Sequence, residues 1–230
     1  GVYGATLAAR ADGTIVQFYV EATDSTAHVR KFPSDAPARV CLYQVDGAPY
    51  PSSLPLYRGV LSSADWNELS TRDVHSDVLL HGTFIQGNDI IYNAGFRYRG
   101  ETSRHEDVKS FRIQLTHDEP FHGIVDLNLN AVEVHLSALA ADFMRRADVP
   151  CFQEQPVAYT LNRSWGAEHG GVYLRVEDGG GDFISRLFPG DDSGNLYRGR
   201  DISTGGEADL TYLGPDPAAY AGIYEKKTNE

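Results

Sequence analysis

The stretch 95-GFRYRGETSRHEDVKSFRIQL-115 decides how the middle of the chain folds. It holds four arginines and one lysine around a Gly-Glu-Thr-Ser turn, between two runs in which apolar and polar residues alternate. Alternation with a period of two is typical of half-buried strands, and a polar turn led by glycine joins such strands. In the second run, the candidates for burial are Val108, Phe111, Ile113 and Leu115. The stretch therefore predicts a cationic β-hairpin.

The charge of the whole chain sets this hairpin apart. The 230 residues carry a formal net charge of −12. That charge argues against nucleic acid or an anionic membrane as the main partner. An anionic ligand needs a local basic patch, and the segment from Arg97 to Arg112 is the densest one in the sequence. The residues alone leave two interpretations open, a solvated basic hairpin and an anion-binding hairpin.

Composition bounds the class of protein. Hydrophobic residues make up 41% of the chain and aromatic residues 11%, which predicts a packed core. No apolar run approaches the roughly 20 residues that a membrane-spanning helix needs. The first residues lack a signal peptide, so we expect either a cytoplasmic protein or a sequence that begins inside a longer precursor. Whether Cys41 and Cys151 pair is open, although two unpaired thiols are favoured. The eight histidines have no zinc-binding spacing and are expected at the surface.

The first 50 residues read as a β-only piece. Strands are expected at 14–23 and 38–45, where β-branched and aromatic residues gather. Two strands are too few for an independent module, so we interpret residues 1–50 as the C-terminal part of an Ig- or fibronectin-like β-sandwich. Residues 46–55 hold three prolines and are the best linker candidate.

Residues 51–230 are predicted to form a second domain. A helix start is expected near Ser63, which we assign as the N-cap, and the one strong helix at 134–147. A short helix follows the glycines at 179–181. Together the elements predict an α+β fold with a mainly antiparallel sheet and one principal helix. Strands are expected at 56–62, 78–86, 89–100, 108–116, 124–130, 155–162, 171–177 and 194–199.

The hairpin carries the chemistry of a phosphate site. Gly100 gives the backbone room, Thr102 and Ser103 supply hydroxyls, Arg104 supplies a charge, and Lys109 stands where the second strand begins. Amides and hydroxyls at such a turn can reach a nucleoside triphosphate while the lysine neutralises it. The glycine-rich loop of protein kinases has three glycines and this turn has one, so the pattern by itself is weak.

The motifs of residues 55 to 230, approximately, resemble the CotH (spore coat protein H) kinase-like family. The runs GFRYRGETSR and VKSFRIQL are similar to the family patterns G-hydrophobic-R-x-R-G-N-S-S and K-(K/S)-S-(F/Y)-R-(I/L). Glu101 stands at the family's Asn and Thr102 at its first Ser. Three further segments resemble the family's later motifs, in the same order: LNLNAVEVHLSALAADFMRRADVP, YTLNRSWGAEHGGVYLRVEDGGGDFISRLF and GNLYRGRDISTGGEADLTYLGPDPAAYAGIYEKKTNE.

This resemblance implies the amino-terminal lobe of an atypical, ATP-dependent protein kinase with a kinase-like fold. It implies a bacterial spore-coat, secreted or cell-surface setting, with a nucleotide as ligand and a protein as phosphoacceptor. Lys109 would be the catalytic, phosphate-binding lysine, and Gly100 to Arg104 the phosphate loop. Glu177 would contact the nucleotide site, either by pairing with Lys109 or by lying at the connection between the lobes.

The sequence departs from the family at its end. The family's catalytic and metal-binding aspartates stand in motifs such as N-x-D-x-x-x-x-N, and no such run occurs here. We therefore expect a domain truncated before its catalytic lobe, Mg²⁺ ligands outside this chain, and no activity of the chain alone. The alternative is a non-catalytic structural or binding module of a coat or cell-surface protein.

Overall fold

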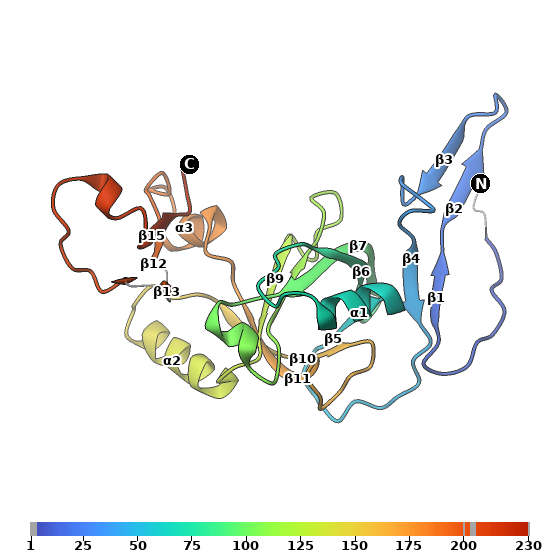
Figure 1. Cartoon of the computed structure of the whole chain (residues 1–230), viewed down its shortest axis with the longest axis horizontal. Helices are drawn as coiled ribbons and strands as arrows, with labels where there is room; N and C mark the ends of the chain where they lie inside the picture. The colour runs from blue at the N-terminus through green and yellow to red at the C-terminus, as the bar shows by residue number, and fades with distance from the viewer. Residues whose placement is uncertain (1–3, 200, 203–205, 230) are drawn as a thin grey trace. The chain divides into compact units, whose positions relative to one another are not determined.

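The computed structural model describes residues 4–199, 201–202 and 206–229. The chain divides into two compact units. The first comprises Gly1–Ala138 and Gln155–Arg175, and the second comprises Leu139–Glu154 and Val176–Glu230. Most of their helices and strands are labelled in Figure 1.

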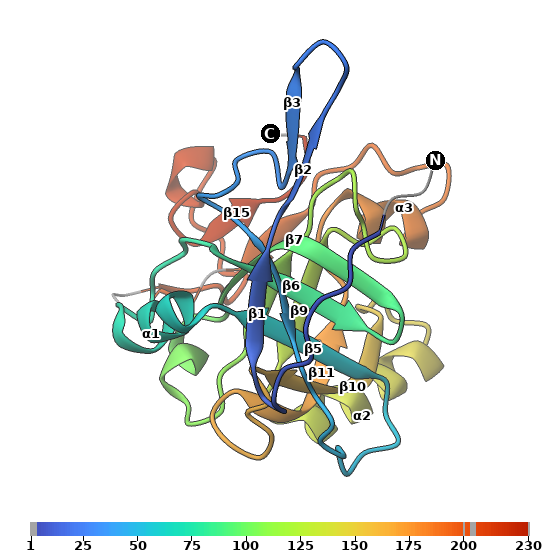
Figure 2. The same ribbon diagram turned by 90° about the vertical axis from the view of Figure 1, so that its right-hand side faces the viewer.

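A closed seven-stranded barrel forms the core of the first unit, with the strand order β10-β11-β9-β8-β7-β6-β5. The run from β5 to β9 is an antiparallel meander, and β10 closes the barrel by pairing in parallel with β5. Several of these strands can be followed in Figure 2. Their bounds are β5 (Leu56–Leu61), β6 (Leu80–Gln86), β7 (Asp89–Tyr98), β8 (Phe111–Gln114), β9 (Asp126–Asn130), β10 (Glu154–Leu161) and β11 (Gly170–Val176).

The strand register separates an apolar interior from a polar exterior. Phe96 pairs with Ile113, which pairs with Leu127, and all three are buried. Successive side chains of a strand point to opposite faces, so the residues on either side of these three along each strand lie on the outer face of the barrel. The burial of Phe111, Ile113 and Leu115 confirms the pattern read from the sequence, whereas Val108 is 39% exposed.

The strands before the predicted linker pair with each other, and β4 (Cys41–Gln44) contacts the barrel where Leu42 N donates to Thr83 Oγ1 at 3.3 Å. β1 (Ile15–Phe18) pairs with β4, and β2 (Val20–Thr23) pairs with β3 (Val29–Phe32). The predicted linker that follows contacts the barrel at Asp46, whose side chain is 3% exposed. Its carboxylate accepts a hydrogen bond from Tyr50 at 2.6 Å and lies 3.1 Å from Arg163 Nε. The boundary at residue 50 remains a prediction.

Three α-helices occur in the described residues: α1 (Ser63–Thr71), α2 (Val134–Arg146) and α3 (Gly181–Leu187). The position of α2 confirms the expected principal helix. The N-cap of α1 is Ser62, so the assignment of Ser63 was wrong. Ser62 Oγ accepts a hydrogen bond from Asp65 N at 3.1 Å, and this amide of the first turn has no partner within the helix. Short 3₁₀ turns are η1 (Thr102–His105) and η2 (Pro217–Ala219).

The apolar stripe of α2 is exposed. Leu136, Leu139, Phe143 and Met144 are between 45% and 62% exposed, and Ala141 is the buried residue of this helix. In the second unit, β12 (Tyr197–Gly199) pairs with β15 (Tyr224–Lys226), and β13 (Asp201–Ile202) pairs with β14 (Gly206–Glu207).

These elements confirm the α+β class. The closure of the sheet into a barrel was not predicted, and the likeness to a kinase lobe remains a prediction. Cys41 and Cys151 are both free thiols. In the described part of the chain, we find no helix with the length and apolarity required to cross a bilayer.

Candidate functional site

The polar exterior of the barrel carries a row of basic side chains. Arg97 of β7 is in register with Arg112 of β8, which is in register with Asn128 of β9. The neighbours of these residues along each strand are buried inside the barrel, so the row faces outward. The side chain of Arg97 is 14% exposed and that of Arg112 is 29% exposed. The alternation of the hairpin thus places its arginines side by side.

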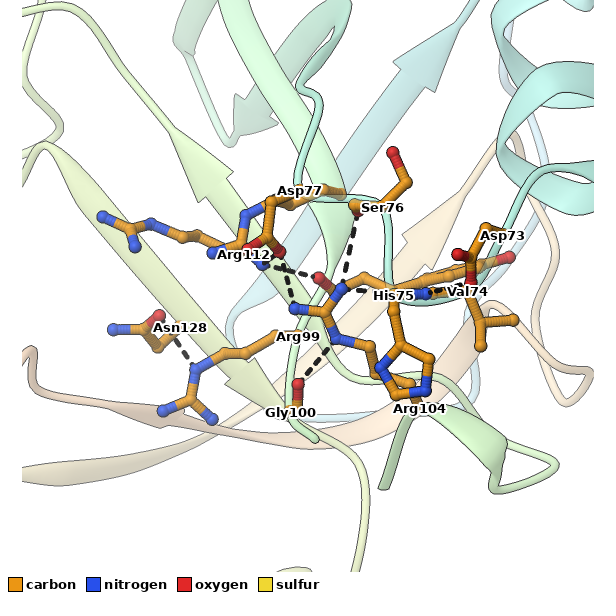
Figure 3. A network of polar contacts seen from close by, with 12 residues as sticks. Asp73, Val74, His75, Ser76, Asp77, Arg99, Gly100, Arg104, Arg112 and Asn128 are labelled. Atoms are coloured by element: carbon orange, nitrogen blue, oxygen red, sulfur yellow. Dashed lines mark hydrogen bonds and ion pairs between the residues drawn. The ribbon is translucent and has the colours of Figure 1, made fainter. Parts of the chain in front are cut away.

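Two carboxylates lie among these guanidinium groups. Asp77 Oδ1 is 2.7 Å from Arg97 Nη1 and 2.7 Å from Arg104 Nη2. Asp126 Oδ1 accepts from Arg112 Nε at 2.9 Å and lies 2.8 Å from Arg112 Nη2. The three arginines therefore share two carboxylates, which leaves one positive charge in this set of five side chains. We call these five residues the arginine cluster; Figure 3 labels Asp77, Arg104 and Arg112.

Within the arginine cluster, the charged form of Arg97 is disfavoured by burial and by neighbouring positive charges. Burial lowers the pKa of Arg97, Asp77 opposes this shift, and the like charges of Arg104 and Arg112 add to it. At Asp77, burial raises the pKa, but the hydrogen bond from Arg104 and the charge of Arg97 outweigh it and hold the pKa below its ordinary value. An additional anion at this face would relieve the repulsion between the guanidinium groups.

Arg99, the residue that follows β7, extends the basic row. Its Nε donates to Asn128 Oδ1 at 3.0 Å, and its Nη1 contacts Asn130 Oδ1. Figure 3 shows the side chains of Arg99 and Asn128 beside each other. Both amides come from β9, so the outer face of three adjacent strands orients the guanidinium groups.

The turn that follows β7 is fixed by Arg104. Gly100 has φ +108°, and a Cβ there would lie 1.9 Å from Ser103 Oγ, so the position requires glycine. The buried guanidinium of Arg104 donates to Gly100 O at 2.6 Å and to Val74 O at 3.2 Å. Thr102 is exposed and Ser103 is half-buried. Arg104 thus ties the turn to the loop after α1, and its contact with a phosphate remains a prediction.

Lys109 lies just before β8 and is held by neighbouring segments. Its Nζ donates to Glu106 O at 2.6 Å and lies 3.7 Å from Glu168 Oε1, and its side chain is 12% exposed. Its backbone N donates to Glu168 O at 3.0 Å, and its carbonyl accepts from Tyr173 OH at 3.0 Å. An ammonium has three donors, so these contacts leave it able to bind a further acceptor.

A family model described as CotH kinase protein matches residues 96–230, which is more than half of the chain. The chain belongs to this family. The match begins at Phe96 in β7 and includes Lys109, the turn from Gly100 to Arg104, and Glu177. The expected resemblance from about residue 55 also covered β5 and β6, which lie outside the match. A search of curated proteins found no match.

Two residues of the segment that matches the CotH kinase family, Tyr98 and His169, meet in the structure. The sequence analysis did not single out either of them. Tyr98 OH is 2.7 Å from Nε2 of His169, which is 4% exposed and packs its ring 4.8 Å from that of Trp66. Burial lowers the pKa of His169, the charge of Glu168 opposes this, and Lys109 lowers it further. No spacing in the sequence connects Tyr98 with His169, because β7 and the residues before β11 meet only in the folded barrel.

Glu177 makes its described contacts within the second unit of the CotH chain. Its carboxylate pairs with Arg186, with Nε 2.8 Å from Oε1 and Nη2 2.5 Å from Oε2. Gln153 N donates to Glu177 Oε2 at 2.9 Å. The ion-pair partner of Glu177 is therefore Arg186, and that of Lys109 is Glu168. The proposed role of Glu177 beside a nucleotide remains a prediction.

The side chains that the structure describes form no cluster of metal ligands. Among them, no three His, Cys, Asp or Glu side chains gather in a way that could hold a metal ion. In kinases one or two carboxylates, together with phosphate oxygens and water, hold the Mg²⁺ that accompanies ATP. The expectation that its ligands lie outside this chain remains a prediction.

Proposed function

We propose that this chain is the ATP-binding portion of a CotH-type protein kinase of a secreted or surface protein. The observation that carries the proposal is the arginine cluster, in which three guanidinium groups share two carboxylates on one face of an acidic protein. Membership of the CotH kinase family supports the same ligand class. A polyphosphate is the anion that best matches several neighbouring guanidinium groups.

The predicted site residues other than Glu177 have distinct parts in this proposal, together with Arg97 and Arg112. Lys109 binds a phosphate oxygen as a point charge. Arg97 and Arg112 bind the remaining phosphate oxygens through their planar donors. Arg104 positions the turn from Gly100, and Thr102 and Ser103 offer hydroxyl donors there. Bound Mg²⁺-ATP supplies the transferable phosphoryl group, and the residues described here bind and orient it.

The test is calorimetric titration of ATP into the 230-residue chain and into Lys109→Met, which keeps the apolar stem and removes the charge. One charge-assisted contact is worth about 1.5–3 kcal/mol, so the affinity should fall about ten- to a hundredfold. Lys31→Met is the matched control, because Lys31 is also ion-paired, 3.5 Å from Glu21, but lies on β3. Thermal melts of all three proteins show whether each variant is folded.

The proposal fails if the native chain binds no ATP at millimolar concentration. In that case the alternative function, a non-catalytic module of a coat or cell-surface protein, is favoured. Equal binding by the native chain and Lys109→Met would overturn the assignment of the lysine and leave the arginine cluster as the remaining site.

A further inference from the structure

Two histidines from separate segments meet at the surface of the first unit. Nε2 of His75, in the loop after α1, lies 3.0 Å from Nε2 of His105, the last residue of η1. The ring centroids are 5.0 Å apart, and both residues are exposed. The two positions are 30 residues apart in the chain, which is why no metal-binding spacing was visible in the sequence. We propose that His75 and His105 form a binding site for a borderline transition-metal ion such as Zn²⁺.

The distance between the two nitrogens fits a shared metal ion. Zinc binds imidazole nitrogen at about 2.0–2.1 Å, and two such bonds at an angle between about 90° and 109° place the nitrogens about 2.9–3.4 Å apart. The observed 3.0 Å falls in this range. A metal ion can therefore be shared at this separation when the exposed rings turn so that both Nε2 lone pairs point to it. Imidazole suits Zn²⁺, Cu²⁺ and Ni²⁺, whereas Mg²⁺ prefers oxygen ligands, so the site selects against the metal of the nucleotide.

The backbone around the pair is already held in place. His75 N donates to Asp73 Oδ1 at 3.0 Å, which fixes the loop just before the ring. Arg104, the neighbour of His105, donates to Val74 O at 3.2 Å and binds Asp77 at 2.7 Å. Arg104 thus ties η1 to the residues on both sides of His75, as Figure 3 shows for this loop and turn. Its charge, which would repel a cation, is paired with Asp77.

The protein supplies two ligands and solvent the others. The absence of any group of three ligating side chains from the described residues means that water completes the coordination. In the metal-free pair one ring donates its Nε2 hydrogen to the other ring. In the metal complex both Nε2 lone pairs bind the ion, so each neutral ring carries its hydrogen on Nδ1. The proton changes position within one ring, and no proton is lost.

The ion would act as a clip between the loop after α1 and η1. An ion that binds only when the two segments are together stabilises the folded state. Neither histidine belongs to the arginine cluster, so metal binding can be measured without nucleotide.

The experiment is a titration of ZnCl₂ into the metal-free 230-residue chain, followed by calorimetry and by the melting temperature. The native chain should bind one equivalent of Zn²⁺ and melt at a higher temperature when it is bound. His75→Ala and His105→Ala should each weaken Zn²⁺ binding by at least ten- to a hundredfold, roughly, because replacing a residue that only contacts a metal ligand already has an effect of this size. Each variant should also lose the rise in melting temperature. His117→Ala, which removes another exposed histidine, is the control and should bind as the native chain does.

Titration with Cu²⁺ gives a second readout. Its electron paramagnetic resonance spectrum should show two coupled imidazole nitrogens in the native chain and one in each of the two alanine variants. The proposal is overturned if the native chain binds no Zn²⁺. It is also overturned if both His75→Ala and His105→Ala still bind one equivalent of Zn²⁺ as tightly as the native chain, or if His117→Ala abolishes Zn²⁺ binding. Since the two rings are exposed, melts without metal should differ by little between the native chain and the variants.

Discussion

Asp77 shows how a single residue joins parts of the fold that carry the basic site. It lies between α1 and β6, accepts a hydrogen bond from Arg104 on η1 at 2.7 Å, and forms an ion pair with Arg97 on β7, also at 2.7 Å. Its pKa is lowered, because the hydrogen bond and charges of the arginines outweigh burial. A carboxylate with a lowered pKa stabilises the folded state above its ordinary pKa, and this contribution is lost as the pH falls through the folded value.

A pH titration tests this reading of Asp77. We expect that the stability of the native chain falls more steeply than that of Asp77→Asn as the pH drops below about 4, near the ordinary pKa of 3.8. The measurement is urea unfolding at a series of pH values between 2.5 and 6, approximately. Asp142→Asn is the comparison for a surface ion pair, because Asp142 also has a lowered pKa but pairs with the exposed Arg146 on α2. Parallel pH profiles for the native chain and Asp77→Asn would contradict the pairing.

At the scale of the element, periodicity alone did not decide which apolar faces are buried. The strands β7 and β8 and the helix α2 all carry apolar residues at the spacing of their structure. In the strands those residues fill the barrel, where Phe96 is fully buried. In α2 they are exposed, with Leu139 at 51%. A barrel closes on its own interior, whereas a helix needs a second surface to cover its stripe.

Paired truncations measure this difference. Phe96→Ala should cost about 3–5 kcal/mol of the free energy of unfolding, because it removes a buried ring and leaves a cavity. Leu139→Ala should change it within about ±0.5 kcal/mol, as expected for an exposed position. Both values come from urea unfolding of the 230-residue chain. A cost above 2 kcal/mol, roughly, for Leu139→Ala would mean that the stripe is covered in solution.

At the scale of the whole molecule, ATP binding and phosphoryl transfer depend on different groups. The family is a kinase family, and the described barrel brings basic side chains together. Phosphoryl transfer also needs a metal ion held by carboxylates, and the sequence contains no N-x-D-x-x-x-x-N run.

We therefore expect the 230-residue chain to bind ATP and to transfer no phosphate by itself. The measurement is incubation with labelled ATP, Mg²⁺ and a generic acceptor protein, with an active protein kinase as the positive control. Label on the acceptor or on the chain itself would show that an aspartate of residues 1–230 serves in the reaction.

The sequence by itself predicted the strands of the barrel, the main helix and the family, whereas β3, β13, β14 and β15 were not predicted. Alternation predicted the burial of Phe111, Ile113 and Leu115, although not the exposure of Val108, and the order of the motifs indicated the CotH family. These are local properties, because periodicity and turn residues are set by near neighbours in the chain.

Only the tertiary structure decided which distant residues meet. The pairing of β10 with β5 that closes the barrel, the contact of Tyr98 with His169, and the meeting of His75 with His105 all join residues far apart in sequence. The same holds for Asp77, which no motif marked and which binds two of the predicted basic residues. Such contacts depend on the register and closure of the sheet, and these are fixed by packing the whole core at once.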